Sequence, residues 1–501
     1  MLSPLRQWSF CRTLFAAFAL LAPACAAEPD LPIPEAEESW QVIYLGDQRV
    51  GYARIMVDPR KVGDETVVHT TAETRLVLKR FGQTLQMSTA IESEESLAGD
   101  LRKFTFSMAN PPAMSTKTTG QVEGGKLNLV SEINGLSKTS SQTWQAGIKS
   151  PTYQDRLLRV TPLKPGETKS VQAFFPEMGK PGTLKVSAYD TETVTLLDGK
   201  TAELQKIKVS NSLVPGVTTN GWINARGDTV KSSTSLLGTE MVTYTVSKEE
   251  ALEKLTVAEL DLGVATLVKV RDIPDPYATK SVVYRLTIPD EDPSQIIPTG
   301  DTQSVKKISD HVCELTVTAL PLPASSTIGK AADEFLKPTP YLQSDDARVQ
   351  KHAEAAAGQL TDPASIARAM EGYVQKRLDK KNFSTALASA AEVAQNLEGD
   401  CTEHAVLLAA MLRVKRIPSR VAVGMVYISN PSAFGGHMWS EALLDGKWVP
   451  LDATLGRGGT GATHIKLGDA TFADESASPI SAFTSLITVI GKLQIEVLRV
   501  E

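Results

Sequence analysis

The stretch from Gly399 to Arg413 combines a two-residue turn, a cysteine and an unbroken run of mostly apolar, helix-forming residues. Gly399 and Asp400 favour a turn, and the Ala/Leu-rich run that follows predicts a buried helix to about Val414. Cys401 then lies in the first turn of that helix. Free N–H groups and the helix dipole stabilise a thiolate there, and the same N–H groups can hold an oxyanion. This stretch therefore predicts a cysteine nucleophile.

The N-terminus has the features of a secretory signal peptide. Arg6 and Arg12 precede and flank an apolar run at 14–22, and small residues surround Cys25. This pattern predicts a signal peptide at 1–26 and therefore export to the periplasm or the medium, with no membrane span after its removal. The alternatives are an uncleaved anchor and a lipid anchor at Cys25.

Cysteine usage singles out Cys401. The chain has four cysteines, and removal of the signal takes away Cys11 and Cys25. Exported proteins normally pair their cysteines or do without them, so the two that remain need a reason. Cys313 lies in an alternating strand pattern, which favours packing. The alternative is a Cys313–Cys401 disulfide, which would block the proposed nucleophile.

Length and composition indicate a multidomain globular protein. The chain has 501 residues, 42% of them apolar and 22% charged, which is enough for roughly three domains. The formal net charge is −6 and no long basic run occurs in the mature chain. Nucleic acid is therefore not an expected partner. The sequence leaves the oligomeric state open.

The N-terminal two thirds of the chain reads as β-structure. Thr- and Val-rich runs of alternating polarity, punctuated by Gly, Asn and Pro, predict a large antiparallel β region at 35–247. A short amphipathic helix at 248–255 marks a boundary. Shorter alternating runs then predict a small β-sandwich-like unit at 262–325.

The composition changes again in the predicted catalytic domain at 335–501, where capping signals and helical periodicity precede three strands. Helices followed by antiparallel strands indicate an α+β domain. Asp445 and Gly446 between the last two strands predict a tight hairpin. The expected helices are 349–359, 361–378, 386–397 and 401–414, and the expected strands are 420–427, 437–444 and 447–451.

The hairpin supplies partners for the cysteine. His437 is expected to begin one of its strands, and Asp452 follows the other, so the pairing brings both to the same end. The carboxylate would fix the tautomer of the imidazole, which would take the thiol proton. Alone, His437 fits a polar residue at a strand edge and Asp452 fits a turn. In combination with Cys401, they predict a Cys-His-Asp site.

Four motifs occur in order within the motif core at 395–470, and together they resemble the transglutaminase-like superfamily in its bacterial exported branch. The resemblance covers about residues 335–470 and implies a papain-like fold, with Cys401 as nucleophile, His437 as base and Asp452 as its orienting group. Arg416, Ser419 and Ala453 depart from the family pattern without removing a reactive group. The motifs are Gly399-Asp400-Cys401-Thr402-Glu403-His404-Ala405, Ile417-Pro418-Ser419-Arg420-Val421 with Gly424, His437-Met438-Trp439-Ser440-Glu441, and Trp448-Val449-Pro450-Leu451-Asp452-Ala453-Thr454.

Further side chains are weaker candidates. His404, one helical turn after Cys401, either tunes the site or, as favoured here, forms a buried hydrogen bond behind it. Gln395 is either an oxyanion donor or a residue on a solvated helix face. Trp439 packs the strands or lines the cleft. The glycine-rich loop at 458–461, with His464, is either a gate or a plain surface loop. No EF-hand, Cys-x-x-Cys or His-Glu-x-x-His pattern occurs, so neither a metal nor a cofactor is expected.

These observations predict an exported enzyme that forms a Cys401 thioester on peptide or protein amides. Because bulk water competes with any amine, hydrolysis is favoured over cross-linking. The alternative is a non-enzymatic cell-envelope protein that uses the same fold to bind peptides or assemble with them.

Overall fold

The computed structural model describes residues 30–111, 115–133, 135–255, 260–474 and 478–501. The predicted signal peptide, with Cys11 and Cys25, lies outside these residues. Within the described ranges, no helix has the length and apolar character needed to cross a bilayer.

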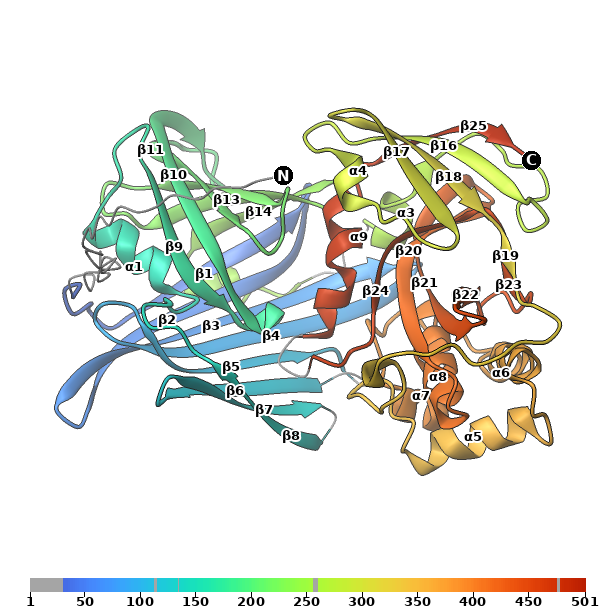
Figure 1. Cartoon of the computed structure of the whole chain (residues 1–501). Helices are drawn as coiled ribbons and strands as arrows, with labels where there is room; N and C mark the ends of the chain where they lie inside the picture. Colours follow the sequence, from blue (N-terminus) through green and yellow to red (C-terminus); the bar gives the residue numbers. More distant parts are fainter. Residues whose placement is uncertain (1–29, 112–114, 134, 256–259, 475–477) are drawn as a thin grey trace, which may run out of the picture.

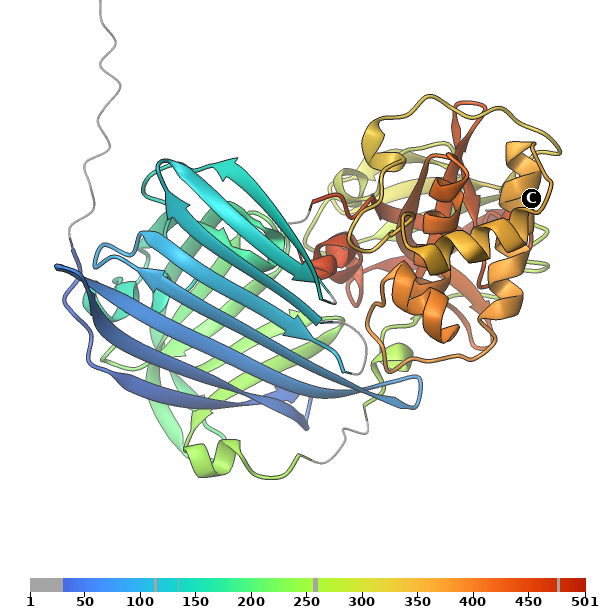
Figure 2. The ribbon, with the colours of Figure 1, turned by 90° about the horizontal axis from the view of Figure 1, so that it is seen from below.

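The first half of the described chain forms one antiparallel sheet of fourteen strands, which confirms the predicted large β region. The sheet is strongly curved and lies beside the C-terminal part of the molecule (Figure 2). Two meanders build it: one runs from β1 to β8, the other from β9 to β14, and they join where β1 pairs with β14. The strands are β1 (Glu37–Leu45), β2 (Gln48–Val62), β3 (Glu65–Arg80), β4 (Gln83–Glu95), β5 (Leu101–Ala109), β6 (Ser115–Glu123), β7 (Lys126–Ile133), β8 (Leu136–Thr143), β9 (Thr168–Phe175), β10 (Lys180–Thr195), β11 (Thr201–Asn211), β12 (Thr218–Ile223), β13 (Thr229–Leu236) and β14 (Thr239–Val246).

Alternating polarity gives the sheet its buried face. Along β7, every second residue is buried, beginning with Leu127 and Leu129, and the residues between them are exposed. Phe104 and Phe174 pack with their ring centroids 4.8 Å apart in the same core. Between β8 and β9 lies α1 (Tyr153–Val160), and η1 (Pro176–Met178) follows β9.

The region predicted as a separate sandwich-like unit forms part of a single four-stranded sheet in the order β17-β18-β16-β25. Its fourth strand comes from the end of the sequence and pairs with β16, so local sequence could not reveal it. Cys313 is buried in β18, and both described cysteines are free, which contradicts the disulfide alternative. The elements are β16 (Ser281–Thr287), α4 (Pro293–Ile296), β17 (Gln303–Ser309), β18 (Val312–Thr318) and β25 (Gln494–Val500).

The C-terminal part is an α+β domain, as predicted (Figure 1). Its sheet has the order β15-β21-β20-β24, and β22 pairs with β21. Helix α8 is almost completely buried. One of its sides packs on β20 and β21, and the other side packs on α5, α6 and α7. The elements are β15 (Val268–Lys269), α5 (Ala347–Ala357), α6 (Pro363–Arg377), α7 (Ala390–Asn396), α8 (Cys401–Val414), β20 (Ser419–Ser429), β21 (Ser432–Leu444), β22 (Lys447–Leu451) and β24 (His464–Ala470).

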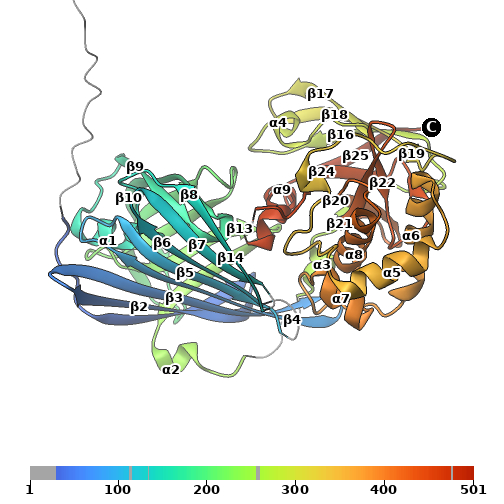
Figure 3. The ribbon, with the colours of Figure 1, turned by 60° about the horizontal axis from the view of Figure 1, so that its bottom comes forward.

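Short elements connect these layers. The helix predicted at 248–255 is the single turn α2, because it ends at Ala251. Helix α9 lies between the large sheet and the sheet of the α+β domain (Figure 3). The connecting elements are α2 (Lys248–Ala251), α3 (Leu262–Ala265), β19 (Leu320–Pro321), η2 (Asp333–Phe335), β23 (Gly459–Thr460), η3 (Pro479–Phe483) and α9 (Thr484–Val489).

Candidate active site

The start of α8 holds Cys401 by a reciprocal cap. The Asp400 carboxylate accepts a hydrogen bond from the Thr402 N–H at 2.9 Å, and the Glu403 carboxylate accepts one from the Asp400 N–H at 2.9 Å. At Gly399, φ is +148°, and a Cβ there would lie only 2.3 Å from the Glu403 side chain, so glycine is required. Cys401 is half-buried as the first residue of the helix.

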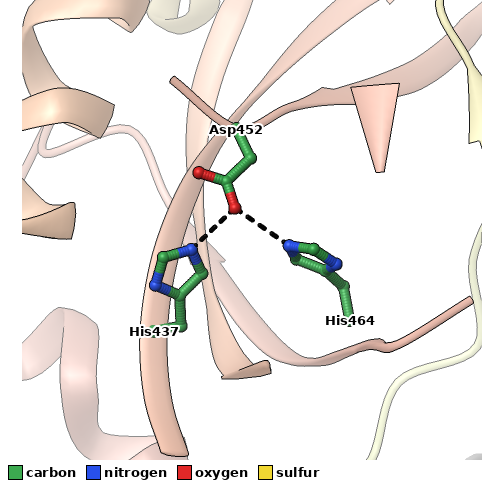
Figure 4. Close-up of side chains that lie close together, drawn as sticks. All are labelled: His437, Asp452 and His464. Carbon is green, nitrogen blue, oxygen red and sulfur yellow. Dashed lines mark hydrogen bonds and ion pairs between the residues drawn. The ribbon is translucent and has the colours of Figure 1, made fainter. Parts of the chain in front are cut away.

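The predicted hydrogen bond between His437 and Asp452 is confirmed. Nε2 of His437 lies 2.8 Å from Oδ2 of Asp452, and both side chains are buried (Figure 4). The hairpin turn at Asp445 and Gly446 has positive φ at both residues, 49° and 75°, as a tight hairpin of this kind needs. One detail was wrong: His437 lies inside β21, which begins at Ser432, because the strand pairs with β20 from Ser432 to Ala442.

Cys401 and Asp452 both act on the protonation of His437. Burial lowers the pKa of His437, but the charges and hydrogen bonds of Asp452 and Cys401 outweigh it and hold the pKa well above its usual value. Burial raises the pKa of Asp452, yet its contacts with His437 and His464 hold it below the ordinary range. The site therefore favours an ionised carboxylate beside an imidazolium.

His464 is the third member of this cluster, and the expectation of a gating or surface loop at this position was wrong. It is buried at the start of β24, and its Nε2 lies 3.0 Å from the same Oδ2 of Asp452 (Figure 4). Burial lowers the pKa of His464 despite the carboxylate. The neutral ring therefore donates its Nε2–H to Asp452.

Within the described residues, His437, Asp452 and His464 form the one group whose geometry could hold a metal ion, with ligand atoms within 4.8 Å of one another. Their facing atoms are already joined by hydrogen bonds, since one carboxylate oxygen accepts from both rings. As it stands, the cluster is built to orient the two imidazoles on a shared carboxylate.

Comparison with known families identifies this part of the chain. A model of the transglutaminase-like superfamily matches residues 350–453, which include all of α6, α7 and α8 and end just after Asp452. The chain carries a transglutaminase-like domain. Among curated proteins, none matches the sequence.

Solved structures resemble the chain only distantly. A candidate cysteine protease from Cytophaga hutchinsonii is 17% identical, with a TM-score of 0.29, over 44% of this chain and 86% of its own. A beta-barrel-like protein of a domain of unknown function from Brucella abortus is 11% identical, with a TM-score of 0.32, over 44% and 98%. A candidate protease from Parabacteroides distasonis is 12% identical, with a TM-score of 0.19, over 68% and 63%. Scores this low carry no conclusion about this chain.

In the transglutaminase-like domain, Glu371 of α6 supports the segment that contains Asp452, a role that sequence reasoning missed. Its carboxylate accepts the backbone N–H groups of Asp452 at 2.9 Å and Gly458 at 2.7 Å. Burial raises the pKa of Glu371 to about 7. A glutamate inside an otherwise apolar helix face was the available signal.

The three weaker candidates occupy different positions in the transglutaminase-like domain. Gln395 is exposed on α7, and its Oε1 accepts a hydrogen bond from Nη1 of Arg348 at 2.6 Å, which favours the alternative of a residue on a solvated helix face. His404 is buried, with Nδ1 2.5 Å from the Asp400 carbonyl oxygen, as expected of a residue behind the site. Burial lowers its pKa to about 4. Trp439 stacks on His437 at 6.2 Å between ring centroids.

The large sheet also reaches the site. Nη2 of Arg80, the last residue of β3, lies 2.7 Å from Oδ2 of Asp400, the residue before Cys401. Burial lowers the pKa of Arg80, but Asp400 and Cys401 hold it above the ordinary value. The arginine is therefore a fixed positive charge beside the cysteine, and it comes from outside the transglutaminase-like domain.

Cys401 and His437 both face a cavity of about 300 Å³ at the junction of the large sheet, α9 and the transglutaminase-like domain. The cavity therefore adjoins both the sulfur and the imidazole.

Proposed function

We propose that the protein is a cysteine-dependent acyl-transfer enzyme that forms a thioester at Cys401 on peptide or protein amides. The observation that carries the proposal is the buried His437–Asp452 hydrogen bond of 2.8 Å, in a site where Cys401 also raises the pKa of His437. The transglutaminase-like domain supports a cysteine chemistry for these residues.

The proposed reaction has two steps. The Cys401 thiolate attacks the amide carbon, and as the C–N bond breaks, the leaving amine takes a proton from the His437 imidazolium. Water then attacks the thioester with the neutral His437 accepting its proton, which releases a carboxylic acid and restores the thiolate–imidazolium pair. Asp452 holds the imidazole through Nε2 in both steps.

The oxyanion formed in each step needs a donor close to Cys401. The capping box engages the N–H groups of Thr402 and Glu403 with the Asp400 side chain. We therefore assign the backbone N–H of Cys401, which points out of the first helical turn, as the oxyanion donor.

Hydrolysis is favoured over cross-linking, because water reaches a half-buried sulfur at far higher concentration than any amine.

We also propose export through the segment at 1–26, with a lipid anchor at Cys25 as the alternative. A non-enzymatic peptide-binding protein of the cell envelope is the second candidate, and the cavity beside Cys401 is the observation in its favour.

The test uses residues 27–501 with a peptide library, with and without an added amine. We expect peptide cleavage that falls roughly a thousandfold or more in Cys401→Ala and is unchanged in Cys313→Ala, the matched control. Transamidated products would indicate a cross-linker. Binding without turnover in the unmodified protein would overturn the enzymatic proposal.

Labelling with iodoacetamide at neutral pH provides a second measurement. Cys401 is expected to react much faster than Cys313, because burial raises the pKa of the Cys313 thiol to about 11. Equal labelling would contradict the assignment of Cys401 as the nucleophile.

A further inference from the structure

The cavity beside Cys401 has an apolar wall built from parts of the chain that are far apart in sequence. The large sheet contributes Leu78, Met87 and Met108, and the α9 segment contributes Phe483, Ile487 and Ile490. The transglutaminase-like domain supplies Cys401 and His437 at one side. Aliphatic, aromatic and thioether side chains thus surround the proposed nucleophile.

The charged side chains in the wall of the cavity already have ionic partners. Among the described residues that line the cavity, the charged side chains are Arg80 and His437, and they are paired with Asp400 and Asp452 respectively. Neither is left to bind a charged ligand. The wall therefore matches a ligand whose surface is apolar.

Polar contacts hold the sheet's part of the wall in place. The Asp261 carboxylate accepts the N–H groups of Phe81 at 2.7 Å and Gly82 at 2.6 Å, at the turn between β3 and β4. Next to them, the Gln83 side-chain oxygen accepts the Phe383 N–H at 2.8 Å. The Gln83 bond ties the turn to the transglutaminase-like domain, and the Asp261 bonds tie it to the start of α3, whose Leu262 and Gly263 also line the cavity.

We propose that this cavity binds a large aliphatic or aromatic side chain of the acyl donor, adjacent to the carbonyl that Cys401 attacks. The substrate class is then peptides with a bulky apolar residue at the cleavage site, and the large sheet selects it. A volume of about 300 Å³ is at the lower end of the range for ligand pockets. This inference rests on the proposed function, since it takes Cys401 as the nucleophile.

A reagent series tests the pocket without requiring turnover. N-alkyl iodoacetamides with chains from methyl to octyl react with Cys401 as the sulfur displaces iodide and a C–S bond forms. Each methylene that enters the cavity is expected to raise the labelling rate by up to about fourfold. The same reagents with a small free thiol in solution correct for intrinsic reactivity.

Variants link that chain-length effect to the wall. Met87→Trp on β4 and, independently, Ile487→Trp on α9 should fill the cavity and reduce the gain in labelling rate from methyl to octyl at least tenfold, with the gain taken relative to the methyl rate of the same variant. Val130→Trp is the matched control, because Val130 is 45% exposed on β7 and does not line the cavity. Circular dichroism verifies that each variant is folded.

Three outcomes would count against these ideas in different ways. Fast methyl labelling of Cys401 with no chain-length effect would overturn the pocket and leave the nucleophile in place. A chain-length effect that survives both tryptophan variants would also overturn it. Slow labelling of Cys401 by every reagent would overturn the proposed function and this inference with it.

For peptide substrates, the expected result is a kcat/KM at least tenfold higher with Leu or Phe than with Asp at the cleavage site.

Discussion

Asp452 is the most constrained residue of the site. One of its oxygens accepts from two imidazoles, and its backbone N–H donates to the Glu371 carboxylate. A buried carboxylate that is bonded in this way cannot rotate without leaving a polar group unpaired. His437 therefore has one stable orientation, with its other ring nitrogen turned away from Asp452 (Figure 4).

At the same scale, Arg80 is expected to support the reactivity of Cys401. In Arg80→Met, the positive charge next to Asp400 and the cysteine is lost, so negative charge on the attacking sulfur is less well stabilised. The rate of Cys401 alkylation by iodoacetamide at neutral pH should fall by up to about tenfold, since one nearby unit charge contributes on the order of 1 kcal/mol. Stopped-flow labelling at a single fixed pH measures this rate.

Arg75→Met provides the control for Arg80, since Arg75 is an exposed arginine on the same strand. Its alkylation rate should match that of the unmodified protein. An unchanged alkylation rate in Arg80→Met would mean that the ion pair with Asp400 is purely structural.

Contacts between site residues could be predicted from the sequence only where they depend on short-range rules. The Asp445–Gly446 turn and strand alternation were sufficient to bring His437 to Asp452. His464, Glu371 and Arg80 reach the site from strands and helices whose positions depend on tertiary packing. Periodicity and turn signals therefore could not predict their contacts with the site.

At the scale of elements, α6 supports the segment after β22 through a buried glutamate. The pKa of Glu371 is about 7 in the folded protein, above its ordinary 4.5. The folded state therefore binds the proton more tightly than the unfolded state. Its contribution to stability is complete below about pH 4.5 and is lost as the pH rises through 7.

The corresponding prediction is that the free energy of unfolding of the unmodified protein falls by up to about 3 kcal/mol over this pH range from Glu371 alone. Glu371→Gln should remove that part of the pH dependence, as measured by urea unfolding at pH 4.5, 6 and 8. Glu354→Gln on α5, an exposed partner of Lys415, should retain it. Parallel pH profiles for the Glu371→Gln variant and the unmodified protein would contradict the prediction.

Elements with strong local signals were predicted well. Helix α8 and strand β22 have the expected bounds, because a capped apolar helix and a tight hairpin are specified by neighbouring residues. Strands β24 and β25 and helix α9 were not predicted. Their short mixed sequences become regular only by pairing or packing with residues far along the chain.

At the scale of the molecule, the turn between β3 and β4 is bonded through Asp261 to the start of α3, the helix that leads into the α+β part. In Asp261→Ala, the N–H groups of Phe81 and Gly82 lose a charged acceptor, which costs about 2 kcal/mol. Amide hydrogen exchange at these two residues should become about thirtyfold faster. Asp58→Ala on β2, whose exposed side chain pairs with Arg60, is the control.

Unchanged exchange in Asp261→Ala would mean that other contacts hold the turn, among them the Gln83–Phe383 hydrogen bond and the packing of Phe81 on Phe383 at 4.9 Å between ring centroids. The order of β and α+β parts was predictable from composition. Their mutual packing was not, because it depends on a few side chains at the end of one hairpin.

The pairing of β1 with β14 also has a kinetic consequence. Trp40 faces Val246 across this pair, so the contact closes a chain segment of roughly 200 residues, whereas the other neighbours in the sheet follow each other along the chain. Contacts between residues this far apart in sequence form slowly, because a long loop must first be closed. Until then, β1 and β14 each present an unpaired edge that can associate with another chain. Substitutions on this pair should therefore slow refolding and promote aggregation at high concentration, while native molecules that have already formed it keep their activity.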